Sequence, residues 1–139
     1  MATRLTTADT SVVVAGLTGW HEAHESSLRA LRGITALPGH VLVETTSVLT
    51  RLPGGRAIAA SEVVTRLRSE FAGQPLCLSA GQHIEFLEAV ARSRIVGGSV
   101  YDALVGFTAG LAGAVLRTRD LRALRTYEVL GIDVEHVRS

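Results

Sequence analysis

Short apolar runs alternate with longer amphipathic segments along this chain of 139 residues, and this alternation constrains the fold more than any other feature. A strand next to a helical segment, repeated along a chain, is typical of α/β folds with a mostly parallel sheet. The apolar runs predict strands at 5–9, 34–37, 76–79, 114–118 and 132–137. The 3.6-residue spacing of apolar residues predicts helices at 20–32, 40–52, 62–72, 80–93, 100–112 and 119–130.

The composition limits the chemistry of the chain. There is one cysteine, Cys77, so an intramolecular disulfide and a cysteine metal cage are excluded, and its apolar surroundings predict a buried, inert thiol. All fourteen basic residues are arginine, which excludes a P-loop lysine and a Schiff-base lysine. The length fits one domain over 1–139, with no repeat or linker.

Neither a membrane span nor a leader is expected. The longest apolar stretch, 103–116, is shorter than the ~20 residues that a spanning helix needs, and Asp102 and Arg117 flank it closely. After Met1 the chain reads ATRLTTADT, which lacks the apolar core of a signal peptide. We therefore expect a cytoplasmic protein.

Four carboxylates lie either where parallel α/β sheets bind ligands or on helix faces that are otherwise apolar. Asp9 and Asp120 follow predicted strands, and ligands of such sheets bind beyond the carboxyl ends of strands. Glu44 lies at the edge of an apolar helix face, and Asp102 shares a helix face with Gly106. Each has a structural alternative: Asp9 and Asp120 could cap turns or helices, and Glu44 and Asp102 could complement a helix dipole.

The four carboxylates are more informative together than singly. In an α/β fold such positions converge at one edge of the sheet, where carboxylates repel each other and raise each other's pKa. A divalent cation relieves this repulsion, and oxygen ligands favour Mg²⁺ or Mn²⁺ over Zn²⁺. A cation held in this way favours phosphodiester hydrolysis by a metal-activated water.

The motifs that carry these acids resemble those of the PIN-domain nucleases, and in particular the VapC toxins of bacterial VapBC toxin–antitoxin pairs. They are Asp9-Thr10-Ser11 after an apolar strand, Glu44 within VLVETTSVL, Asp102 within YDALVGFTAG, and Thr118-Arg119-Asp120 after AVL. All four occur in the family's order, and the resemblance covers essentially the whole chain.

This resemblance implies a three-layer α/β/α sandwich around a mostly parallel sheet, forming a single PIN-like nuclease domain. It implies a Mg²⁺- or Mn²⁺-dependent endoribonuclease that cuts structured RNA such as tRNA or rRNA. It also implies a homodimer and a VapB-like antitoxin that blocks the site. The catalytic acids would be Asp9, Glu44, Asp102 and Asp120, with Asp9, Asp102 and Asp120 as metal ligands, Ser11 and Thr118 in support, and no assigned role for Arg119.

Three other functions compete with this one. A PIN nuclease of RNA maturation or DNA cleavage would carry the same four acids, although the small size of the chain favours the toxin. A catalytically silent PIN-like binding module would not need four converging carboxylates. An aspartyl-phosphate enzyme is disfavoured because residue 11 is serine and no lysine is available to stabilise the phosphoryl group.

Overall fold

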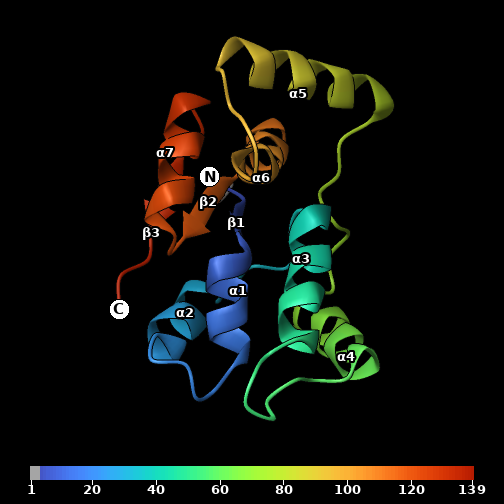
Figure 1. Cartoon of the computed structure of the whole chain (residues 1–139), viewed down its shortest axis with the longest axis vertical. Helices are drawn as coiled ribbons and strands as arrows, with labels where there is room; N and C mark the ends of the chain where they lie inside the picture. The colour runs from blue at the N-terminus through green and yellow to red at the C-terminus, as the bar shows by residue number, and fades with distance from the viewer. Residues whose placement is uncertain (1–3) are drawn as a thin grey trace.

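The chain folds into a small parallel sheet surrounded by helices (Figure 1). The computed structural model describes residues 4–139. The strands are β1 (Thr6–Ala8), β2 (Val115–Thr118) and β3 (Val134–His136). The helices are α1 (Thr10–Leu17), α2 (His24–Ala30), α3 (Gly39–Thr50), α4 (Ala60–Glu70), α5 (Ala80–Arg92), α6 (Ser99–Leu111) and α7 (Leu121–Val129).

The sheet has the order β1-β2-β3, and both strand pairs are parallel. Ala8 pairs with Arg117, so the residues that follow, Asp9 and Thr118, stand side by side where the two strands end. The amide of Asp9 donates to the carbonyl of Arg117 at 3.0 Å and continues the ladder by one step. The register therefore places the chemistry-bearing turns after β1 and β2 next to each other.

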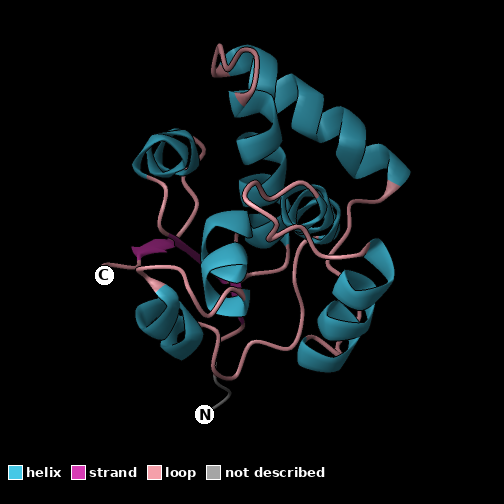
Figure 2. Ribbon diagram, turned by 60° about the horizontal axis from the view of Figure 1, so that its bottom comes forward, coloured by secondary structure: helices cyan, strands magenta, loops and turns pink. Residues whose placement is uncertain are grey.

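Helices cover the sheet on both sides, as expected for an α/β/α arrangement. Helices α6 and α7 pack against β2, and α1 packs against β1 and β2. In Figure 1 the sheet lies between α6 and α7 in the upper part of the view and α1 and α2 in the lower part, and Figure 2 shows how small it is beside the helices around it. One apolar core links these layers and includes Val12, Leu49, Leu116 and Tyr127.

Two predicted strands, 34–37 and 76–79, are wrong. They meet in one isolated parallel bridge between Pro38 and Leu76 and form no strand of the sheet. The carbonyl of Ala36 accepts from the Thr7 side-chain hydroxyl at 2.9 Å instead of from a strand amide. Pro38 has no N–H to extend the bridge, so the pairing cannot propagate into a ladder.

Other boundaries differ in ways that follow from local packing. The helix predicted from residue 20 begins at His24, because 18–23 form turns in which the Ala23 amide donates to Nδ1 of His21. Cys77 is exposed rather than buried, because the segment that carries it is not a strand of the sheet. No helix among residues 4–139 is long and apolar enough to cross a membrane.

Candidate active site

Asp9 is the most buried carboxylate of the site. It is 5% exposed and caps α1, with Oδ1 accepting from the Ser11 amide at 3.1 Å and from the Ser11 hydroxyl at 2.5 Å. Burial raises its pKa above the ordinary value of 3.8, while hydrogen bonds from Ser11, Thr118 and Tyr127 lower it. Asp9 can therefore cap α1 and also take part in a functional site, because the cap uses only one of its two carboxylate oxygens.

The hydroxyls of Ser11 and Thr118 join the two turns that follow β1 and β2. Ser11 Oγ accepts from the Arg119 amide at 2.8 Å and lies 3.4 Å from Thr118 Oγ1. Thr118 Oγ1 in turn accepts from the Asp120 amide at 3.0 Å. These contacts fix both turns relative to each other and hold Asp9 and Asp120 at the same edge of the sheet.

Asp120 caps α7 with one of its two oxygens. Oδ1 accepts from the amides of Arg122 and Ala123 at 2.9 and 3.3 Å, which satisfies two of the otherwise unpaired N–H groups of the helix. Oδ2 of Asp120 has no hydrogen-bond partner among residues 4–139. Asp120 therefore combines a capping role with an oxygen available to the site.

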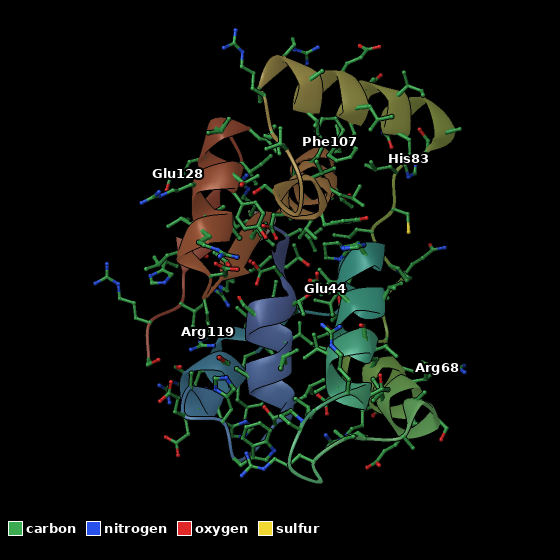
Figure 3. The ribbon with its side chains drawn as sticks, in the orientation of Figure 1. Glu44, Arg68, His83, Phe107, Arg119 and Glu128 are labelled. Atoms are coloured by element: carbon green, nitrogen blue, oxygen red, sulfur yellow. The ribbon has the colours of Figure 1, made fainter. Side chains whose placement is uncertain are left out.

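Glu44 and Asp102 reach the site from α3 and α6. Figure 3 shows Glu44 on the side of α3 that faces α1, and Arg119, from the turn after β2, to the left of α1. The Glu44 side chain is 41% exposed, and its Oε2 lies 3.9 Å from His40 Nε2. Asp102 is half-buried in the first turn of α6 and forms no hydrogen bond or ion pair within the described chain.

The electrostatics of Asp102 show that the four carboxylates share one environment. Its pKa is raised to about 6, first by desolvation and then by the negative charges of Asp120, Glu44 and Asp9, while the positive charge of Arg122 lowers it. A half-buried carboxylate that three other carboxylates repel is under-neutralised at neutral pH. The four predicted acids thus lie in one acidic cluster, which we call the carboxylate site.

The donor set of this site suits an oxygen-liganded cation. Asp102 has no hydrogen-bond partner among the described residues and experiences the negative charges of three carboxylates against one positive charge, that of Arg122, which is the charge imbalance that a divalent cation removes. No three His, Cys, Asp or Glu side chains in residues 4–139 are arranged closely enough to hold a metal ion. The carboxylates therefore influence each other electrostatically without forming a ready-made metal site. The residues fit Mg²⁺ or Mn²⁺ in chemistry and charge, and the ion would have to gather them.

Sequence reasoning missed Tyr127. Its ring is 1% exposed on the inner face of α7, and its hydroxyl donates to Asp9 Oδ2 at 2.9 Å. Burial and the charges of Asp9, Asp102 and Asp120 raise its pKa, which keeps the hydroxyl protonated as a donor. The available signal was a tyrosine on the apolar face of a helix, because a buried tyrosine hydroxyl needs a partner.

A close helix contact seats the Tyr127 ring. A Cβ added at Gly106 of α6 would lie 2.7 Å from Cδ1 of Tyr127, so only glycine allows the ring to lie against α6. The space beside Gly106 is thus filled by a side chain of the neighbouring helix α7. Helix α6 therefore carries Asp102 and also positions the donor to Asp9.

Comparison with known proteins identifies the fold and its relatives. The PIN domain family matches residues 7–129. The chain is 49% identical over 129 residues to Ribonuclease VapC40 of Mycobacterium tuberculosis, covering 93% of this chain and 96% of that protein. It is 43% identical over 128 residues to Ribonuclease VapC27 of the same organism, covering 91% and 92%. A solved structure of FitAB bound to an IR36 DNA fragment is similar in fold, with a TM-score of 0.71, 16% identity and coverage of 95% and 94%.

Proposed function

Because this chain belongs to the PIN-domain family and is a VapC-like member of it, we propose that it is a Mg²⁺- or Mn²⁺-dependent endoribonuclease that acts as the toxin of a type II toxin–antitoxin pair. The observation that supports this proposal is the environment of Asp102, whose pKa is raised to about 6 first by burial and then by the charges of Asp120, Glu44 and Asp9. Its substrate would be specific structured RNA, such as tRNA or rRNA, in the cytoplasm.

The chemistry proposed is hydrolysis of one phosphodiester bond. A water oxygen bonds to phosphorus, the bond from phosphorus to the leaving ribose oxygen breaks, and the proton of the water ends on that oxygen. A bound Mg²⁺ or Mn²⁺ would supply water activation and stabilise charge on the phosphate. Asp9, Asp102 and Asp120 would hold it, and Glu44 would complete the set or orient the water.

The residues around the acids prepare them for this task. Ser11 and Tyr127 donate to opposite oxygens of Asp9, so its carboxylate plane is fixed before a ligand binds. Thr118 holds the turn that presents Asp120. Arg122 in the first turn of α7 brings a positive charge near Asp102, where its guanidinium could hold an RNA phosphate in bidentate fashion.

Cleavage of total cellular RNA by the purified protein tests the proposal. We expect cuts at a few discrete sites with Mg²⁺ or Mn²⁺, none with EDTA, and none with Asp9→Asn. The matched control is Asp133→Asn, since Asp133 is exposed, pairs with Arg4 at 2.7 Å and lies outside the carboxylate site. Cleavage by Asp9→Asn at the wild-type rate would contradict the proposal, as would equal loss of cleavage in Asp133→Asn.

The antitoxin partner has a candidate surface in a groove between α3 and α4. It encloses about 620 Å³ and is lined by apolar side chains, including exposed Val43 and Val64 and buried Phe71, with Arg68 at its border. Figure 3 shows the Arg68 side chain extending outward from α4. We propose that an apolar antitoxin segment fills this groove and that an acidic antitoxin residue pairs with Arg68.

Substitution in this groove should separate inhibition from catalysis. Val64→Glu places a charge in the groove, so the cognate antitoxin should no longer suppress RNA cleavage, while cleavage by the free protein stays unchanged. Val96→Glu, at a more exposed valine outside the groove, should leave suppression intact. Full suppression of Val64→Glu would place the antitoxin elsewhere.

The homodimer is proposed on a second apolar surface. Helix α5 packs on α6 at the top of the view in Figure 1. It exposes Ile84 and Leu87, which are three residues apart and share a helix face. We propose that a second copy of the chain covers them. Sedimentation should show a dimer for the wild type and a monomer for Ile84→Glu, and a dimer in both would contradict this surface.

A further inference from the structure

An aromatic ring stands exposed beside the carboxylate site. Tyr101 lies in the first turn of α6, directly before Asp102, and is 57% exposed. Of the exposed apolar side chains, Val43, Tyr101 and Leu121 each adjoin a residue of the site in sequence, and Tyr101 is the aromatic one among them. At this exposure, packing in the core does not account for the position of the ring.

The orientation of this ring is fixed by a second ring. Tyr101 stacks on His40 with centroids 5.4 Å apart and planes 11° apart, which is a nearly parallel arrangement. His40 lies in the first turn of α3, and its Nε2 is 3.9 Å from Oε2 of Glu44. The two rings therefore connect the helices that supply Glu44 and Asp102.

The stack leaves one face of Tyr101 available. His40 is the less exposed ring and covers one side of Tyr101, so the surface that Tyr101 presents to solvent is its edge and its opposite face. No other aromatic ring in residues 4–139 stacks on Tyr101. A planar ring held rigidly with one open face is pre-organised to stack on another planar group at small entropic cost.

We propose that the open face of Tyr101 is a stacking platform for an unpaired RNA base next to the phosphate that occupies the carboxylate site. This inference rests on the proposed ribonuclease function and adds a base-binding subsite to it. Unpaired bases in loops are splayed and stack on aromatic side chains, whereas paired bases cannot reach them. The subsite would select single-stranded positions in structured RNA, and it would tolerate any base because each has a π face.

Binding of two 12-nucleotide probes tests the platform. The probes are a fluorescent single-stranded oligoadenylate and an abasic ribose-phosphate strand of the same length, titrated with Mg²⁺ present and followed by anisotropy. The parent is Asp9→Asn, which we expect to bind RNA without cutting it. Variants in this parent are Tyr101→Phe, which keeps the ring, and Tyr101→Leu, which keeps an apolar side chain without it.

The expected result is a preference of the parent for the base-bearing probe that Tyr101→Phe keeps and Tyr101→Leu loses, by about tenfold or more for one stacked base. The control is Trp20→Leu. Trp20 is a 51% exposed aromatic residue that contacts Arg56 beyond the C-terminal end of α1, whereas Asp9 caps the N-terminal end of that helix. This variant should bind both probes as the parent does.

Two results would overturn the platform. Equal affinity of the parent for both probes would do so, as would a Tyr101→Leu variant that keeps the preference of the parent. Cleavage by the otherwise wild-type chain separates this failure from failure of the proposed function. If the wild type cuts RNA and Tyr101→Leu cuts with an unchanged KM, only the platform is wrong, whereas a wild type that cuts no RNA contradicts the ribonuclease itself.

Discussion

At the scale of single residues, substitution of Tyr127 tests whether the buried Asp9 carboxylate needs the hydrogen-bond donor that comes from the other end of the chain. Tyr127→Phe removes the hydroxyl that donates to Asp9 Oδ2 and keeps the ring that packs against Gly106. We expect a loss of about 1–2 kcal/mol in the free energy of unfolding, because a buried carboxylate oxygen loses its partner. RNA cleavage should fall as well, since Oδ2 of Asp9 then loses the donor that holds it.

Urea denaturation and the cleavage assay measure these two effects. Tyr101→Phe is the matched control, because it removes a tyrosine hydroxyl that forms no hydrogen bond within the described residues. Equal stability of Tyr127→Phe and wild type would mean that the hydroxyl contributes nothing to the fold.

The ionised form of Asp102 should lower the free energy of unfolding of the metal-free protein at neutral pH. Its pKa in the folded chain is about 6, raised from an ordinary value of 3.8, so its contribution to stability is fully present below pH ~3.8 and is lost as the pH rises through about 6. Asp102→Asn removes this loss. With EDTA present, the variant should be more stable than wild type at pH 7 by about 1 kcal/mol, after allowance for solvent screening of a half-exposed group.

The pH dependence distinguishes this effect from ordinary repacking. Near pH 4 wild-type Asp102 is largely protonated, and the stability difference from Asp102→Asn should vanish in urea denaturation. The variant should also cut no RNA. Asp133→Asn, which changes an exposed carboxylate paired with Arg4, should show no gain at pH 7. A gain for Asp102→Asn that is the same at pH 4 and pH 7 would contradict the electrostatic cause.

The sequence predicts the four acids, but not what organises them. Asp9 and Asp120 are predictable because each lies where an apolar strand ends, and Glu44 and Asp102 because each interrupts an apolar helix face. Tyr127 is not predictable in this way. Its hydroxyl meets Asp9 across 118 positions of sequence, and a helical pattern shows which face is buried without showing which polar atom the face meets.

At the scale of elements, the contact between α6 and α7 should depend on one glycine. Gly106→Ala raises helix propensity by about 1 kcal/mol, yet its Cβ would lie 2.7 Å from the Tyr127 ring. Overpacking of this kind costs about 1–3 kcal/mol, so we expect net destabilisation. Because displacement of the ring also withdraws the donor from Asp9, RNA cleavage should fall in the same variant.

Gly81→Ala in α5 is the matched control for this prediction. A Cβ at Gly81 meets nothing within 4 Å, so only the propensity gain applies, and the variant should be as stable as wild type or slightly more so. Thermal unfolding of the two variants measures the difference. Stabilisation by Gly106→Ala would mean that the ring yields easily and that the helix contact does not position it.

The elements themselves were predictable to different degrees. The helices from 40–52 onward and the strands that end near Asp9 and at Thr118 match the expected ranges closely, because each combines a strong apolar pattern with a cap or glycine signal. The runs 34–37 and 76–79 are equally apolar, yet they form one bridge. Strand formation depends on a partner backbone in register, and the apolarity of a short run carries no information about that partner.

At the scale of the whole molecule, the carboxylate site draws its members from both ends of the chain: from the turns after β1 and β2 and from helices α3 and α6. These elements share a buried core, but at the site they bring negative charges together. A cation bound there would exist only in the folded chain, because the unfolded chain does not assemble the four acids. Metal binding should therefore stabilise the whole fold.

Thermal unfolding with and without Mn²⁺ at pH 7 measures this linkage. At a free concentration of about 100 times the Kd, binding to one site adds about 2.7 kcal/mol, which corresponds to a rise in Tm of roughly 5–10 °C for a domain of this size. Asp9→Asn should abolish the rise, and Asp133→Asn should keep it, because Asp133 lies on the surface with Arg4. The rise should shrink at pH 5, below the raised pKa of Asp102, since a proton then competes with the cation. A rise of equal size in Asp9→Asn would place the cation away from these carboxylates and would remove the electrostatic reason for their convergence.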